Sequence, residues 1–210
     1  MTQQVPLSDD AIAPDRVETD DATHEVAEDL AYLRLLIANV VFVGAKESPD
    51  WVLVDAGVMG TKSRIRDAAE ARFGAGTRPL AVILTHGHFD HVGALEDLAA
   101  EWDVPVYAHV LEHPYLDGTA SYPPADPSVG GGLMAALSPF YPVKPVNVGD
   151  RLRPLPSDGS MPGMPGWRWL ATPGHSPGHV SLWRETDRTI LAGDADVTPV
   201  SHPVGTRVLG

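Results

Sequence analysis

The chain of 210 residues contains no cysteine, so disulfide bonds and thiolate metal ligands are excluded. Any metal ion must therefore be held by nitrogen and oxygen donors. Long apolar runs are missing too: Arg34 and Asn39 interrupt the stretch 30–43, and nothing approaches the roughly eighteen apolar residues of a membrane span. The N-terminus lacks a basic region followed by an apolar one, so we expect a cytoplasmic protein with neither a secretory signal nor a membrane partner.

Basic residues are few, because 15 Lys and Arg stand against 28 Asp and Glu and give a net charge of -13. A nucleic-acid surface usually carries a basic patch, so we expect no nucleic-acid partner. Much of the acidic excess lies in residues 1–29, which contain nine acidic side chains and one base, Arg16. We expect residues 1–24 to form a flexible acidic arm and residues 25–210 to fold as one domain.

Alternating strand-like and helix-like segments predict an α/β domain. One long strand or two consecutive strands are expected within 30–43, and a returning strand at 51–54 would complete a hairpin at the edge of a sheet. Helices are expected at 63–73 and 93–102, and further strands at 80–84, 104–108, 167–171, 180–184 and 189–191. The Pro- and Gly-rich segment 117–145, with a short helix expected at 133–137, is either a lid over the substrate or a plain surface connection.

The densest chemical signal is the run Thr85–His91, with the sequence THGHFDH. It follows an apolar strand, and side chains two apart in an extended backbone share a face, so His86 and His88 can point into one pocket. The turn into the next helix re-aims Asp90 and His91, which could serve a neighbouring position. Neutral imidazole and carboxylate oxygen are ordinary ligands of zinc and similar divalent metals. The run therefore predicts a metal site.

These residues resemble the HxHxDH signature of the metallo-β-lactamase superfamily. Residues 172–179 (TPGHSPGH), the Ala-Gly-Asp at 192–194 and the strand 51–57 fit the same family in the expected order. The resemblance implies an αββα sandwich, with a second half that we expect to be incomplete because little sequence follows Asp194. The family has a further histidine ligand later in the chain, and the role of His202 is left open because it comes sooner than that pattern expects.

The resemblance also implies two metal sites that share a bridging carboxylate, Asp194. The ligands would be His86, His88 and His175 for one ion, and Asp90, His91 and Asp194 for the other. We expect two Zn²⁺ ions as cofactors, with iron or manganese as alternatives. A hydroxide held between metal ions roughly 3.5–4 Å apart would attack a carbonyl carbon or a phosphorus. Asp90 is the expected catalytic residue, because its carboxylate could orient this nucleophile.

The sequence contains further polar residues that could lie near the metal site. Asp55 ends an early strand, where it could accept a hydrogen bond from a ligand histidine or a backbone amide, or merely cap the strand. His179 is expected to make a structural hydrogen bond rather than a metal bond. His109 and His113, four apart on an expected helix, are interpreted as pocket or surface residues because the His-Glu-x-x-His motif is absent.

The leading hypothesis is a metal-dependent hydrolase that directs a metal-bound hydroxide at a small ester, thioester, lactone or related molecule. One alternative is a truncated or degenerate domain with a partial metal site and a binding role or no catalytic role. Another is a mononuclear iron oxygenase of the same superfamily. We expect a small-molecule substrate, and assembly into a homo-oligomer is left open. The fold and the motif do not fix the substrate.

Overall fold

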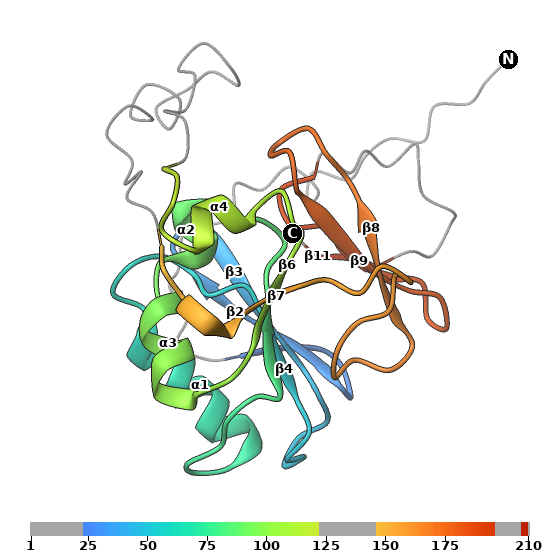
Figure 1. Cartoon of the computed structure of the whole chain (residues 1–210). Helices are drawn as coiled ribbons and strands as arrows, with labels where there is room; N and C mark the ends of the chain where they lie inside the picture. The colour runs from blue at the N-terminus through green and yellow to red at the C-terminus, as the bar shows by residue number, and fades with distance from the viewer. Residues whose placement is uncertain (1–22, 122–145, 196–206, 210) are drawn as a thin grey trace, which may run out of the picture.

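Two β-sheets packed face to face form the centre of the computed structural model, which describes residues 23–121, 146–195 and 207–209 (Figure 1). Within those ranges the larger sheet has seven strands in chain order: β1 (His24–Ala27), β2 (Leu30–Leu35), β3 (Ala38–Val43), β4 (Val52–Val54), β5 (Ala81–Ile83), β6 (Val106–Ala108) and β7 (Leu152–Pro154). The smaller sheet has the order β11 (Arg207–Leu209), β10 (Thr189–Leu191), β9 (Val180–Arg184) and β8 (Trp167–Ala171). The helices are α1 (Lys62–Phe73), α2 (Phe89–Val92), α3 (Leu95–Trp102), α4 (His113–Leu116) and the short 3-10 helix η3 (Gly149–Arg151).

The larger sheet changes from antiparallel to parallel at β4. Strands β1 to β4 pair antiparallel, whereas β4, β5, β6 and β7 pair parallel. Every residue of β4 and β5 is buried, as expected for short apolar strands that are covered on both faces. The stretch 30–43 forms two strands, β2 and β3, and the predicted hairpin with the returning strand is confirmed by the antiparallel pairing of β3 and β4, but its predicted place at the sheet edge is wrong. The edge on this side is β1, whose sequence HEVA gives little strand signal.

Each face of the larger sheet has its own apolar core. On one face, side chains such as Phe42 and Leu53 pack against Ile65 of α1 and Leu98 of α3. On the other face, the sheet packs against the smaller sheet, with Trp167 and other residues of β8, β9 and β10 in the same cluster. The helices α1 and α3 therefore cover the outer face of the larger sheet, as Figure 1 also shows. Within the described ranges, no helix covers the outer face of the smaller sheet.

The strands β4 and β5 place two loops side by side at one end of the sandwich, because parallel strands end at the same edge. The N–H of Ala56 donates to the carbonyl of His91 at 2.7 Å, and the N–H of Gly93 donates to the carbonyl of Gly57 at 2.7 Å. A Cβ atom at Gly93 would lie 2.1 Å from the backbone nitrogen of Met59. The turn at α2 is therefore joined to the loop after β4 by direct backbone contact.

Some predictions fall outside the described residues. These include the helix expected at 133–137 and almost all of the acidic arm at 1–24, which stays a prediction; its last residue, His24, lies in β1. Among the helices that are described, none has the length and apolar character needed to cross a membrane.

Candidate metal centre

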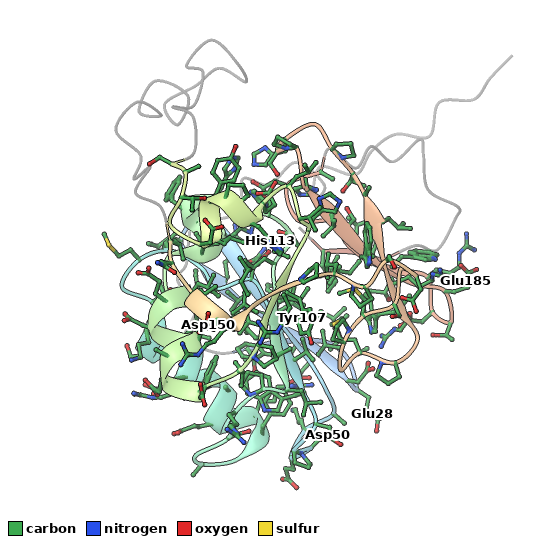
Figure 2. All side chains as sticks on the ribbon, viewed as in Figure 1. Glu28, Asp50, Tyr107, His113, Asp150 and Glu185 are labelled. Atoms are coloured by element: carbon green, nitrogen blue, oxygen red, sulfur yellow. The ribbon has the colours of Figure 1, made fainter. Side chains whose placement is uncertain are left out.

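Segments from both sheets bring the candidate ligands to one end of the sandwich. Thr85–His91 follows β5, residues 172–179 join β8 to β9, and Asp194 follows β10. The carboxyl ends of parallel strands are a common place for ligand binding in α/β proteins. Asp50, in the turn between β3 and β4, lies at the far end of the larger sheet from His113 (Figure 2).

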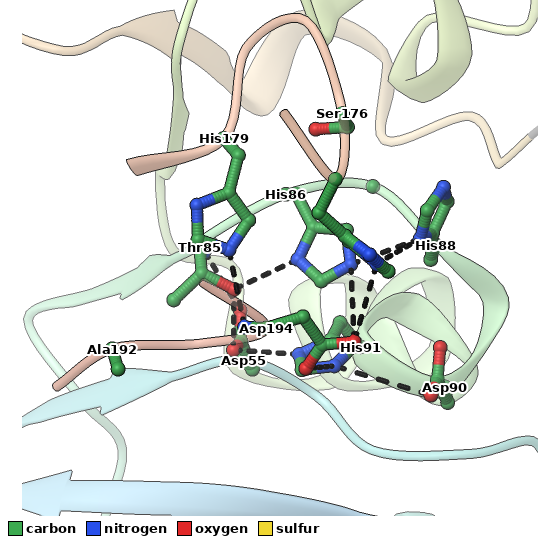
Figure 3. Close-up of polar contacts among 12 residues, drawn as sticks. Asp55, Thr85, His86, His88, Asp90, His91, Ser176, His179, Ala192 and Asp194 are labelled. Carbon is green, nitrogen blue, oxygen red and sulfur yellow. Dashed lines mark hydrogen bonds and ion pairs between the residues drawn. The ribbon is translucent and has the colours of Figure 1, made fainter. Parts of the chain in front are cut away.

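Three imidazoles form the first donor group, which we name the imidazole group: His86 and His88, which are labelled in Figure 3, and His175. Nδ1 of His88 lies 3.1 Å from Nε2 of His86 and 2.7 Å from Nε2 of His175. One ring nitrogen thus faces two others, although it can donate at most one proton. Nitrogen ligands of a tetrahedral zinc ion lie roughly 3.4 Å apart when the bonds are about 2.0–2.1 Å long. A small outward adjustment of these three nitrogens would give that arrangement.

The second donor group, which we name the mixed group, consists of His86, His91 and Asp194. Oδ1 of Asp194 lies 3.2 Å from Nε2 of His91, while Oδ2 lies 3.2 Å from Nε2 of His175 and 4.0 Å from Nε2 of His86. The Asp194 carboxylate therefore reaches both groups, each with a different oxygen. His86 belongs to both groups as well, so the two share one end of the sandwich.

Asp55 lies behind both groups and orients their histidines. Its Oδ1 accepts the Thr85 N–H at 2.8 Å, and its Oδ2 accepts both the Thr85 hydroxyl and Nδ1 of His91 at 2.8 Å. The Thr85 oxygen is then free to accept the Nδ1 proton of His86 at 3.1 Å. In this arrangement Nδ1 of His91 donates to Asp55 and Nδ1 of His86 donates to Thr85, so Nε2 of each ring faces the site. Of the two interpretations of Asp55, acceptance from a ligand histidine and a backbone amide is the one that the structure has.

Two rings of the imidazole group, those of His86 and His88, are kept neutral by their surroundings. Burial lowers the pKa of His86 well below its ordinary value, and the nearby rings of His91 and His88 lower it further. Burial also lowers the pKa of His88, to about 4, and His175 acts in the same direction. Near neutral pH these rings therefore hold lone pairs rather than extra protons, which is the form that binds a metal ion.

The mixed group has the opposite electrostatic character. Burial alone would lower the pKa of His91, but Asp55 and Asp194 outweigh burial and raise that pKa well above its ordinary value. Burial would raise the pKa of Asp194, but hydrogen bonds from His175 and His91 lower it far below its ordinary range. The ionised Asp194 carboxylate therefore requires a positive partner, either a proton on His91 or a metal ion.

Asp90 lies beside the mixed group rather than within it. Its Oδ2 is 4.0 Å from Nε2 of His91, and burial raises the pKa of the Asp90 carboxyl. The expected roles of Asp90, as a metal ligand and as the residue that orients the nucleophile, stay predictions. His202 lies outside the described residues.

His179 makes structural hydrogen bonds, as predicted, and these bonds hold the backbone of Asp194. The Asp194 N–H donates to Nε2 of His179 at 3.1 Å, and Nδ1 of His179 lies 2.8 Å from the Thr172 hydroxyl. The Ser181 hydroxyl donates to the carbonyl of Ala192 at 3.0 Å, so Thr172 donates to Ser181 at 3.1 Å and accepts from His179. Burial lowers the pKa of His179, which favours the neutral ring that this proton arrangement requires.

The expectation that His109 and His113 share a helix is wrong, because α4 begins only at His113. The His109 ring packs edge-on against Trp169, with ring centroids 5.7 Å apart, and Nε2 of His113 lies 3.3 Å from the carbonyl of Ala108. Neither histidine belongs to a donor group.

Sequence reasoning misses Glu112, which is fully buried and bonded to two loops that carry candidate ligands. In the sequence it follows Val110 and Leu111, whose apolar character suggests burial. The structure reverses this pattern, since Val110 is 55% exposed and Leu111 is 52% exposed. The only sign of Glu112 in the sequence is that a carboxylate follows shortly after an apolar strand, and this alone is weak evidence for a functional residue.

The donor atoms fit a borderline divalent cation such as zinc. Nitrogen predominates, His86 and His88 are neutral, and a single carboxylate supplies negative charge to both groups. His86 and His91 are each oriented by a hydrogen bond to the ring nitrogen that faces away from the site, which is usual for metal-binding histidines. The fold and the site together define a two-sheet α/β metalloprotein.

Comparison with known proteins agrees with this class. The model of the metallo-beta-lactamase superfamily matches residues 33–206. The chain is 46% identical over 178 residues to "Probable metallo-hydrolase YflN" of Bacillus subtilis (strain 168), which covers 84% of this chain and 67% of that protein. It is 32% identical over 153 residues to "Probable metallo-hydrolase YybB" of the same organism, which covers 73% of this chain and 60% of that protein. Among solved structures, "Rm3 metallo-beta-lactamase" has a TM-score of 0.61 at 22% identity, covering 89% of this chain and 69% of that chain.

The chain belongs to the metallo-β-lactamase superfamily, which confirms both the resemblance seen in the sequence and the expected fold family. The matched part spans 67% of one relative and 60% of the other. The relatives named above are called probable metallo-hydrolases, whereas the similarity to the solved structure concerns the fold alone.

Proposed function

We propose that this chain is a zinc-dependent hydrolase that binds two metal ions and cleaves a small ester, thioester, lactone or related acyl compound. The observation that carries the proposal is the position of Asp194, whose two oxygens lie 3.2 Å from histidines of different donor groups. A carboxylate in this position can hold two cations at a short separation. When bound, such a pair of ions makes water more acidic and stabilises negative charge on the substrate oxygen.

Residues of the chain would bind the metal ions, orient the ligand histidines and orient the attacking water. The imidazole group supplies nitrogen ligands, and Asp55 and Thr85 keep Nε2 of His86 and of His91 directed at the site. In this proposal Asp90, whose Oδ2 lies 4.0 Å from Nε2 of His91, accepts a hydrogen bond from the attacking water and so orients it. Because burial raises the pKa of Asp90, its carboxylate is a better proton acceptor than an ordinary aspartate.

Apolar side chains on the neighbouring loops favour a substrate with an apolar acyl part. Met59, on the loop after β4, is 77% exposed, and Val110 and Leu111, on the loop after β6, are also exposed. Leu36 and Ile37 are exposed in the turn between β2 and β3. Exposed apolar side chains gathered near a polar site commonly contact the non-reacting part of a ligand.

The proposal is tested by elemental analysis together with a hydrolysis screen, on the wild-type chain and on His88→Ala. We expect about two equivalents of zinc in the wild type, a clear loss in the variant, and turnover of at least one ester, thioester or lactone that falls by roughly 100-fold or more in the variant. Bound iron with oxygen consumption would instead support the oxygenase alternative. A folded wild type that takes up no divalent metal would contradict the proposal.

A further inference from the structure

Glu112 is a fully buried carboxylate that lies just outside both donor groups. It occupies the turn between β6 and α4, and its side chain points into the protein while Val110 and Leu111 face outwards. Burying a carboxylate is unfavourable unless several donors compensate for the lost water. The hydrogen-bond partners of Glu112 therefore indicate the role of this buried carboxylate.

Three donors from two separate loops meet this carboxylate. Its Oε2 accepts the backbone N–H of Gly87 at 3.0 Å. Its Oε1 accepts the Ser176 hydroxyl at 2.8 Å and the backbone N–H of Gly178 at 2.7 Å. No cation takes part in these bonds. All three donors are neutral groups, so hydrogen bonds compensate this carboxylate for the water it has lost.

The donors stand next to the ligands in the sequence. Gly87 lies between His86 and His88, and Ser176 follows His175 directly. The carboxylate thus connects a loop of the larger sheet to a loop of the smaller sheet at the places where the imidazoles project. The separation of 2.7 Å between Nδ1 of His88 and Nε2 of His175 depends on how these two loops are held.

We propose that Glu112 is a positioning residue that ties the Gly87 turn to the loop carrying His175 and so sets the spacing of the imidazole group. This inference rests on the proposed metal site for its effect on binding, although the link between the loops can be measured without metal. Glu112 touches no donor atom of either group. It acts through the backbone on each side.

Gly178 provides independent support for a close fit at this point. A Cβ atom there would lie 2.7 Å from Cγ and from Oε1 of Glu112. Its backbone φ lies outside the left-handed region, so alanine would be tolerated by the backbone and would conflict mainly with Glu112. Gly178→Ala therefore disturbs the same link without removing the carboxylate.

Glu112→Gln is the sharpest variant, because it keeps the shape and exchanges one acceptor for a donor. The amide oxygen would stay with Ser176 and Gly178, which offer two donors. The amide nitrogen would then face the N–H of Gly87, and that hydrogen bond would be lost. The variant should loosen the turn that carries His86 and His88 and leave the second loop nearly unchanged.

The first measurement is backbone amide exchange by NMR on the metal-free protein. In Glu112→Gln we expect exchange at Gly87 to become faster by about tenfold or more, as for the loss of one charge-assisted hydrogen bond, with little change at Gly178. The matched control is Glu47→Gln, the same chemical change at an exposed side chain in the turn between β3 and β4. Wild-type exchange at Gly87 in a folded Glu112→Gln protein would overturn the proposal.

The second measurement is zinc affinity by competition with a coloured chelator, accompanied by the visible spectrum of the cobalt-loaded protein. Loss of a residue that orients ligands usually weakens metal binding by about 10- to 100-fold. We expect this loss, with an altered cobalt spectrum, in both Glu112→Gln and Gly178→Ala but not in Glu47→Gln. If Glu112→Gln does not fold, wild-type zinc affinity in Gly178→Ala overturns the proposal. A wild type without zinc affinity would refute the proposed function, and exchange at Gly87 would still decide the role of Glu112.

Discussion

The imidazole group and the mixed group share His86 and one end of the fold, yet their electrostatics are opposite. In the imidazole group, burial and neighbouring rings lower the pKa of His88 to about 4. In the mixed group, Asp55 and Asp194 raise the pKa of His91 well above its ordinary value. The residue type is the same, and the nearby carboxylates account for the difference.

Because of this contrast, metal ions must compete with protons more strongly at the mixed group than at the imidazole group. The imidazole group offers lone pairs that a cation can use directly. The mixed group already holds a proton on His91 when metal is absent, so a metal ion must displace that proton before Nε2 can bind. We therefore expect the imidazole group to bind metal more readily, and the mixed group to fill with a stronger dependence on pH.

The largest effect should come from changing the residue that the two groups share. His86→Gln removes a donor from both groups, so we expect near-complete loss of bound metal. His88→Gln removes a donor from the imidazole group alone and should keep up to about one equivalent. Elemental analysis of both variants, after dialysis against buffer with the same free zinc concentration, measures the difference. Equal metal content in the two variants would contradict the idea that His86 serves both groups.

A selective effect is expected from Asp55→Asn, which should weaken the mixed group. The asparagine Nδ2 would face Nδ1 of His91, so that ring would move its proton to Nε2 and lose the lone pair directed at the site. We expect the affinity for a second ion to fall by about 10- to 100-fold while the first ion is retained. Calorimetric titration with zinc gives the affinities, and nitrogen chemical shifts of His91 report the change of tautomer.

The control for Asp55→Asn is Asp50→Asn, the same substitution at an exposed residue in the turn between β3 and β4, at the far end of the sheet (Figure 2). Wild-type affinity for both ions in Asp55→Asn would show that the orientation of His91 does not depend on this carboxylate.

The smallest effect concerns the stability of the metal-free protein in mild acid. The pKa of His88 is lowered in the folded state, so as the pH falls the unfolded chain takes up this proton first, and the folded state loses stability between about pH 6.5 and pH 4. At pH 5 a pKa shift of this size lowers the free energy of unfolding by about 2 kcal/mol. We therefore expect the wild type to lose about 2 kcal/mol more of its unfolding free energy than His88→Gln between pH 7.5 and pH 5. Urea unfolding at the two pH values measures this, and an equal loss in both proteins would contradict it.

Sequence reasoning predicted correctly the strands and helices whose apolar pattern and length are both typical of the same kind of element. The hairpin of β3 and β4, the helix α1 and the consecutive strands β8, β9 and β10 all follow such patterns. The strands β1 and β7 escaped prediction because each is short and polar at a sheet edge, and β7 ends in Pro154. Edge strands are fixed by pairing with a neighbour, which a local pattern does not reveal.

The candidate site was predictable where donors cluster in the sequence. His86, His88 and His91 lie within six residues, and the structure gathers them with His175 and Asp194. Glu112 could not be predicted in the same way, because its partners are 25 and 64 or more residues away and include two backbone N–H groups. Any residue supplies a backbone N–H, so the sequence around Gly87 and Gly178 gives no sign of an acceptor.

The contact between Gly93 and the backbone at Met59 has a consequence for motion. Because this junction has no room for one additional carbon atom, we expect α2 and the loop after β4 to move together. The run Thr85–His91 and the loop that begins at Asp55 would then keep their relative positions whenever the end of the larger sheet shifts.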